Sequence, residues 1–225
     1  MKLTTAAAAL AASLALAGTA QAAQVYNVEV WKGADDVVAS SNNAAELPTG
    51  SSVASFTWTG DINWRQEGPQ NSSEVFGQFG EFLDGFSTQA SNFISTVYGS
   101  DAAFLGDSMT IAGDSFVTFF KITRSYVGPA FNGTIHHDDG ALLTSNGVTV
   151  YSSPAETSEV VAPYHLNAGA NNLVLTYVSG NGQPSVLSFS SPVPEPATWA
   201  MMIVGFGAAG AMVRGARRKQ ALALA

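Results

Sequence analysis

The residues best suited to chemistry form one run, His136-His137-Asp138-Asp139-Gly140. Two adjacent carboxylates at the end of a strand, followed by a glycine, could supply oxygen ligands to a hard cation such as Ca²⁺. The same carboxylates could instead shape a turn by accepting hydrogen bonds from backbone N–H groups. The residue types leave both interpretations open.

The histidines suggest zinc binding or acid–base chemistry, but their spacing argues against both. In a strand, His136 and His137 point to opposite faces, so they cannot readily share one metal ion. His165 is remote from them in the sequence. We therefore expect all three to be surface histidines or hydrogen-bonded ones.

Two Gly-Asp-Ser triplets, at 106–108 and 113–115, have only a superficial likeness to hydrolase nucleophiles. No G-x-S-x-G pattern surrounds them, and neither lies in a strand–serine–helix elbow. They are typical of turns that flank a short apolar segment. The sequence also has no phosphate-binding or dinucleotide-binding motif. We predict that the protein is not an enzyme.

Two tryptophans, Trp58 and Trp64, flank the segment 60–63, and aromatic faces can stack on sugar rings. Packing in the core is the alternative, and it is the expected role of Trp58. Trp64 lies beside Arg65 and Gln66, so both roles stay open for this residue.

The elements that position these residues read mainly as strands. Six stretches are rich in β-branched and aromatic side chains between turn formers, namely 25–31, 52–59, 115–125, 148–151, 173–178 and 186–189. Asn146-Gly147 predicts a hairpin turn. Many short strands with frequent turn signals favour an all-β chain with a single sandwich-like or barrel-like domain.

Two segments depart from this strand pattern. Four apolar residues recur at three to four positions, Phe76, Phe79, Leu83 and Phe86, which predicts a short amphipathic helix. The segment 188–196 is rich in serine and proline and is typical of an extended linker.

The chain ends in an uncharged apolar stretch, 197–213, followed by a basic end at 214–219. As a helix, the stretch would be about 25 Å long, close to the hydrocarbon thickness of about 30 Å. Its glycines are common in membrane helices, Trp199 suits the outer interface, and the basic end suits the cytoplasm. We predict one C-terminal transmembrane helix.

The tail as a whole resembles the PEP-CTERM sorting signal of Gram-negative bacteria. The matching residues are Pro194, Glu195, Pro196, Trp199, Ala200, Arg214, Arg217 and Arg218. The resemblance implies recognition by an exosortase-type processing enzyme, transient anchoring in the inner membrane, and delivery to the cell surface or extracellular matrix. The same tail type is also labelled an ice-binding-protein C-terminal domain, but no Thr-x-Thr ladder indicates ice binding here.

The N-terminus has the pattern of a secretory signal peptide. A positive start at Met1-Lys2 precedes an Ala- and Leu-rich stretch, and Ala20-Gln21-Ala22 supplies the small-x-small cleavage pattern. We expect a signal helix that signal peptidase removes after Ala22 or one residue later. The predicted organisation is a signal peptide at 1–22, a β domain at 23–190 and a sorting tail at 191–225.

The charge composition of the β domain excludes some classes of partner. Between Ala23 and Pro192, four basic side chains stand against sixteen acidic ones, a net charge of −12. Such a surface repels nucleic acid and favours cations, and it also keeps an exported protein soluble. The chain has no cysteine, so no disulfide can stabilise the fold. The stability of the fold must therefore come from its hydrophobic core.

A second resemblance covers residues 116–190. The run Asp138-Asp139-Gly140-x-Leu142-x4-Gly147-Val148-x-Val150, with Leu166-x-Ala168-Gly169 and Leu173-Val174-Leu175-x-Tyr177 downstream, is similar to the core of PA14-type domains. The resemblance implies a β-sandwich-like barrel, and in some members paired aspartates hold a calcium ion that binds sugar hydroxyls.

The PA14 resemblance assigns calcium to Asp138 and Asp139. It also places Asn181, in the turn at 180–183, in the region from which a third ligand comes. A module that binds extracellular polysaccharide, through Ca²⁺, is the first functional expectation. The alternative is a structural protein of the exopolysaccharide matrix with no small ligand.

Overall fold

The computed structural model describes residues 23–34, 43–67, 77–109, 116–180, 184–192 and 205–210. Ala23–Pro192 form a compact unit of their own, separate from 1–22 and 193–225. Within the tail, 205–210 are helical. No helix in the described part of the chain is long and apolar enough to cross a membrane.

Several sequence predictions lie outside the described residues. They include the signal helix at 1–22 with its cleavage residues Ala20 and Ala22, and most of the membrane span predicted at 197–213. The sorting residues Pro194, Glu195, Pro196, Trp199, Ala200, Arg214, Arg217 and Arg218 lie outside them as well.

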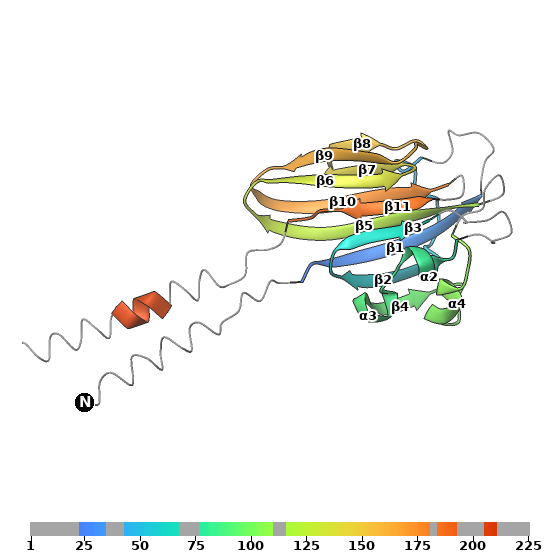
Figure 1. The fold of residues 1–225 in the computed structure, drawn as a ribbon, viewed down its shortest axis with the longest axis horizontal. Coiled ribbons are helices and arrows are strands. Elements are labelled where there is room, and N and C mark those ends of the chain that lie inside the picture. Colours follow the sequence, from blue (N-terminus) through green and yellow to red (C-terminus); the bar gives the residue numbers. More distant parts are fainter. Residues whose placement is uncertain are drawn as a thin grey trace, which may run out of the picture. The chain divides into compact units, whose positions relative to one another are not determined.

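The compact unit is built from antiparallel strands (Figure 1). Their bounds are β1 Val25–Ala34, β2 Ala54–Thr59, β3 Ile62–Gln66, β4 Ala90–Ser95, β5 Phe116–Gly128, β6 Phe131–Asp138, β7 Ala141–Ser145, β8 Val148–Ser153, β9 Val160–Leu166, β10 Gly169–Ser179 and β11 Ser185–Phe189. A seven-stranded sheet has the order β4-β2-β1-β5-β10-β7-β8, and a four-stranded sheet has the order β3-β11-β6-β9. The predicted all-β, sandwich-like fold agrees with this arrangement.

Alternating side chains give each strand one buried face. In β2, Ala54, Phe56 and Trp58 are buried and the residues between them are not. In β3, Trp64 is buried while its neighbours Asn63 and Arg65 are exposed. This period of two is what the strand geometry requires when only one face meets the core.

Aromatic rings join the two sheets across the core. Trp58 of one sheet and Trp64 of the other pack edge to face with ring centroids 5.1 Å apart. Trp64 also lies 5.8 Å from Phe120 of β5. Each tryptophan is only 1% exposed. Sugar stacking by Trp64, one of its two candidate roles, is therefore wrong, because its ring is enclosed by the core.

The predicted helix around 76–86 is two shorter helices, α2 Phe79–Phe82 and α3 Phe86–Gln89. Gly85 separates them with a φ of 84°, a left-handed conformation that glycine adopts without strain. Phe79, Leu83 and Phe86 of the pattern are buried and Phe76 lies outside the described residues, so the pattern identified core-facing residues but not the break. A third helix, α4, spans Asp101–Leu105.

The described part of the segment expected to be a linker, 188–192, belongs to the fold, and 193–196 lie outside the described residues. Its first residues, Ser188 and Phe189, are part of β11, and Ser191 and Pro192 are buried. The backbone O of Ser191 accepts a hydrogen bond from Gln24 Nε2 at 3.3 Å. The described unit therefore stays packed up to the residues that immediately precede the sorting tail.

A buried arginine ties the two ends of the unit together. Arg124 of β5 donates from Nη1 to Gln24 Oε1 at 3.0 Å and to the Ser191 hydroxyl. Its guanidinium carbon lies 5.4 Å from the centre of the Tyr26 ring. Arg124 thus contacts both the residue that precedes β1 and a residue that follows β11.

We expect Phe120→Ala to destabilise residues 23–192 by about 3–5 kcal/mol, because the removed ring leaves a cavity between the sheets. Val127→Ala in the same strand, where the side chain is 73% exposed, should change stability by less than about 0.5 kcal/mol. Urea unfolding of both variants checks this. Equal losses would contradict the described core.

Candidate functional site

The Asp138-Asp139-Gly140 segment forms a corner between the sheets. Asp138 is the last residue of β6 in the four-stranded sheet, and Ala141 opens β7 in the seven-stranded sheet. Only Asp139 and Gly140 connect the two strands, so the chain must turn sharply. The structure places the predicted aspartates side by side, at the end of a strand as the sequence suggested.

The turn is held through the backbone of Asp139, which has a φ of 68°. Its N–H donates to the Thr157 carbonyl at 3.1 Å, and its carbonyl lies 2.6 Å from His137 Nδ1. Left-handed backbone is uncommon for residues with a side chain, and aspartate tolerates it better than most. These two contacts keep Asp139 in that conformation.

His137 has a defined neutral tautomer. A carbonyl oxygen can only accept, so Nδ1 carries the proton that it donates to the Asp139 carbonyl. Nε2 then accepts from the Tyr151 hydroxyl at 2.5 Å. Burial lowers the pKa of His137, which keeps the ring neutral. Both ring nitrogens are engaged, so His137 positions the turn and is not free to bind a metal.

The two carboxylates are nearly enclosed, with Asp138 8% and Asp139 4% exposed. Asp138 Oδ1 accepts from the Asp139 N–H at 3.0 Å. Asp139 Oδ2 accepts from the Gly180 N–H at 2.8 Å, just after β10. Each carboxylate therefore has one oxygen fixed by a backbone donor, as the turn-shaping interpretation expects.

The electrostatics of the pair are unfavourable for two negative charges. Burial raises the pKa of Asp139 to about 8, and the charges of Asp138 and Glu156 add to this effect, while the Gly180 N–H opposes it. Burial also raises the pKa of Asp138, which Glu159 reinforces and Arg65 counteracts. A buried carboxylate in such surroundings is either protonated or compensated by a cation.

More polar groups lie buried near the pair. Ser179 and Ser185, both fully enclosed, are hydrogen bonded through their hydroxyls at 2.7 Å. The hydroxyl of Tyr177 is buried, and it interacts with the Ser179 side chain and the Val186 backbone. Burial raises the pKa of Tyr177, and the charges of Asp139 and Asp138 raise it further, so the hydroxyl stays neutral near them.

The described residues supply only part of a metal-ligand set. They contain no group of three or more histidine, aspartate or glutamate side chains that could hold a metal ion. Asn181, predicted as a further ligand, lies outside the described residues. Sequence reasoning missed the roles of His137 and Tyr177, and the only available signal was their position in strands that end beside the aspartates.

The remaining histidines lie on the protein surface as expected. His136 Nε2 lies 2.5 Å from Glu159 Oε1, and His165 Nδ1 lies 2.7 Å from Asn132 Oδ1. His136 is part-exposed whereas His137 is fully buried, as opposite faces of a strand require.

The first Gly-Asp-Ser triplet is structural. Asp107 pairs with Lys32 and accepts from the Tyr98 hydroxyl at 2.5 Å, which ties the end of α4 to β1. The second triplet, at 113–115, lies outside the described residues.

Gly140 is required by close packing. A Cβ atom at this position would lie 2.0 Å from the Pro154 carbonyl oxygen and 2.7 Å from Val178 Cγ1. The turn therefore has no room for a side chain, and alanine would push β7 away from the 154 segment.

We expect Gly140→Ala to destabilise residues 23–192 by about 1–3 kcal/mol, the usual cost of overpacking. Gly99→Ala is the control, because nothing lies within 4 Å of the added atom. Thermal unfolding of the two variants compares them, and an unchanged melting temperature for Gly140→Ala would contradict the described corner.

The raised pKa of Asp139 predicts a pH dependence in the presence of chelator. The native state binds the proton of Asp139 more tightly than the unfolded state does. The stabilisation that this proton provides is therefore complete below about pH 4 and is lost as pH rises toward about 8. The loss is at most about 6 kcal/mol. Asp139→Asn removes this titration. Urea unfolding at pH 5, 7 and 9 should therefore show wild type losing stability relative to Asp139→Asn, and parallel curves would refute the prediction.

Similar solved structures include two PA14 domains, the domain type that residues 116–190 resemble. A PA14 sugar-binding domain from an RTX adhesin is 15% identical, with 76% of this chain and 90% of that chain covered at a TM-score of 0.46. The PA14 domain of the MpAFP antifreeze protein is 14% identical, with 77% and 86% covered at a TM-score of 0.48. A β-glucosidase from Kluyveromyces marxianus is 11% identical, with 79% and 19% covered at a TM-score of 0.37.

A search of curated proteins finds no match. A family model of the PEP-CTERM protein-sorting motif matches residues 192–219. This match confirms the interpretation of the Pro194-Glu195-Pro196 tail. The motif marks a protein for export and for membrane-associated sorting by an exosortase-type enzyme. The C-terminus of this chain therefore carries a PEP-CTERM sorting signal.

Proposed function

We propose that the chain is a surface or matrix protein whose β domain binds glycan through a calcium ion held at Asp138 and Asp139. Signal peptidase would release the N-terminus, and the apolar segment 197–213 would hold the chain in the inner membrane of a Gram-negative bacterium until an exosortase acts. The proposed role of the domain is binding, not catalysis.

The observation that carries this proposal is the burial of two successive carboxylates, of which Asp139 has no compensating cation. No described cationic side chain pairs with Asp139, although the carboxylate is almost fully enclosed. The neutral Tyr177 hydroxyl is also buried near it. A bound cation would satisfy both the charge and the free oxygens.

The donor set favours calcium over zinc. The atoms on offer are carboxylate, hydroxyl and carbonyl oxygens, which hard cations prefer. The nearby imidazole of His137 is committed to the Asp139 carbonyl and to Tyr151, so the site lacks the nitrogen or sulfur ligands of a typical zinc centre. Asp138, Asp139 and Tyr177 would contribute to the site, and Asn181 would complete it from the adjacent turn.

A sugar ligand follows from the PA14 resemblance and suits the charge of the domain. A calcium ion at the surface can take vicinal sugar hydroxyls as its outer ligands. The net charge of −12 between Ala23 and Pro192 disfavours polyanions. An uncharged extracellular polysaccharide is therefore the proposed partner.

We expect Ca²⁺, at a concentration 100 times its dissociation constant, to raise the free energy of unfolding of residues 23–192 by about 2.7 kcal/mol relative to chelator. The melting temperature should rise by about 5–10 °C. Asp138→Asn/Asp139→Asn should abolish the rise. Asp84→Asn/Asp101→Asn, which removes the same charge from exposed positions, should retain it.

A melting temperature that does not change when Ca²⁺ is added would rule out the proposed calcium site. The alternative would then stand, a structural matrix protein in which the aspartates only shape the turn. The bonds from the Asp139 and Gly180 N–H groups to the two carboxylates are the observations that favour this alternative.

A further inference from the structure

The outer face of the four-stranded sheet carries a second polar site. Residues paired directly across neighbouring strands share a face. Asn63, Ser188 and His136 form such a row across β3, β11 and β6. The next row on this side contains Arg65, which is exposed, and Val186 and Asp138, which are only 2% and 8% exposed.

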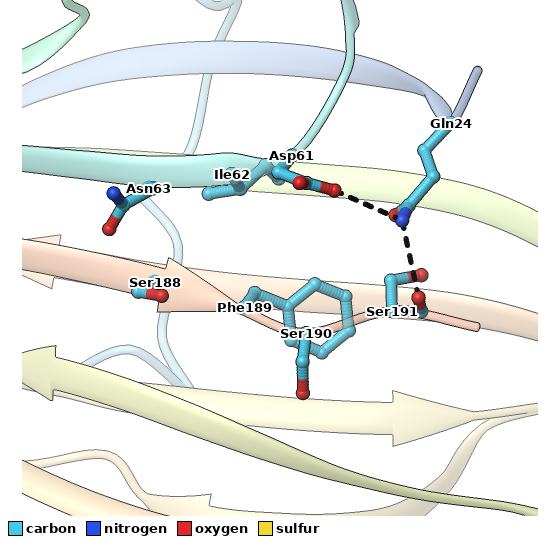
Figure 2. Close-up of a pocket in the computed structure, with 8 residues that line it drawn as sticks. All are labelled: Gln24, Asp61, Ile62, Asn63, Ser188, Phe189, Ser190 and Ser191. Carbon is cyan, nitrogen blue, oxygen red and sulfur yellow. Dashed lines mark hydrogen bonds between the residues drawn. The ribbon is translucent and has the colours of Figure 1, made fainter. Parts of the chain in front are cut away.

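A pocket of about 400 Å³ opens along β3 and β11 on this face (Figure 2). It is lined by Gln24, Asp61, Ile62, Asn63, Ser188, Phe189, Ser190 and Ser191. Its volume lies at the lower end of the range for ligand sites, about 300–1,000 Å³. Ile62 and Phe189 are 1% and 3% exposed and belong to the core, so the pocket meets a ligand with hydroxyl, amide and carboxylate groups, which suit the hydroxyl groups of a sugar.

One end of the pocket is rigid. Gln24 is 7% exposed, and its Nε2 donates to Asp61 Oδ1 at 3.2 Å and to the Ser191 carbonyl at 3.3 Å. Both bonds are drawn in Figure 2. Gln24 Oε1 in turn accepts from Arg124 and from the Tyr26 hydroxyl. The Asp61 carboxylate is thus oriented before any ligand arrives, which lowers the entropy cost of binding.

Gln24, Ser190 and Ser191 are already hydrogen bonded, but three other polar side chains of the pocket can bind a ligand. No described residue hydrogen-bonds to the side chains of Asn63 or Ser188, or to Asp61 Oδ2. They offer an amide, a hydroxyl and a carboxylate oxygen along neighbouring strands. Hydroxyl groups of a ligand can both donate to the carboxylate and accept from the amide.

The charges of this face select against anionic ligands. No cationic side chain lines the pocket. Arg65, one row away, is already paired with Glu67 and Glu159, and His136 also lies against Glu159. Asp61 and Asp138 would repel a carboxylate or sulfate on a ligand.

We propose that this pocket binds an uncharged hexose chain, as a site that needs no calcium. The sugar class of the ligand accords with the proposed function, but the pocket itself does not depend on the calcium site.

The test is isothermal titration calorimetry on the full chain in a sugar-free zwitterionic detergent, with residues 23–192 in parallel. The probes are the uncharged hexasaccharides of α-1,4-glucose, β-1,4-glucose and β-1,4-mannose, and a hexauronate. We expect at least one uncharged probe to bind in chelator, and the hexauronate to bind at least tenfold more weakly.

Asn63→Ala/Ser188→Ala should weaken the binding of that probe at least tenfold, both in Ca²⁺ and in chelator. Asn27→Ala/Ser125→Ala removes the same residue types from exposed positions of the seven-stranded sheet and should have no effect. Asp138→Asn/Asp139→Asn should leave the binding measured in chelator intact, which separates this site from the calcium site.

Absence of binding by all three uncharged probes would overturn the proposal. Binding that survives Asn63→Ala/Ser188→Ala would overturn it too, whatever the outcome of the calcium experiment. Binding in chelator without any calcium-dependent stabilisation would support the pocket while removing the proposed calcium site.

Discussion

The register of strand β11 determines where both candidate sites lie. β11 sits between β3 and β6, and its pairing aligns Leu187 with Trp64 on one side and His137 on the other, all three buried. Alternation then turns the next residue, Ser188, outward together with its cross-strand neighbours. A slip of one residue would bury the polar row and expose the tryptophan, so burial of large side chains enforces the display of small polar ones. The same inward row holds His137, whose imidazole fixes the corner that carries the aspartates.

Much of the fold can be read from the sequence, because one buried face leaves a period-two pattern. All six strands expected from that pattern are present, and Asn146-Gly147 forms the predicted turn between β7 and β8. Strands β3, β4, β6, β7 and β9 are not indicated as clearly. Pro163 lies within β9, which tolerates it as an edge strand, and β6 ends in polar residues that only the corner explains.

The candidate site was predictable in its residue types but not in its surroundings. Adjacent aspartates before a glycine predict a turn or a cation site, and the structure places them in a buried corner. The partners of that corner come from distant segments: the Thr157 carbonyl, the Gly180 N–H and the Tyr151 hydroxyl. No local pattern encodes such contacts, because they arise from the meeting of two sheets. Trp64 shows the same limit, since polar neighbours in a strand say little about the side on which the ring lies.

The position of β11 in the chain also sets the order of events during export. It is the last strand of the unit in the chain, yet it is an inner strand of its sheet. Ile62 of β3 therefore has no partner strand until Phe189 of β11 is available to pair with it. If the chain crosses the membrane from its N-terminus, the four-stranded sheet stays open until nearly the whole unit has emerged. The sorting signal begins a few residues later, at 192. The last strand that the four-stranded sheet needs therefore directly precedes the sorting signal in the chain.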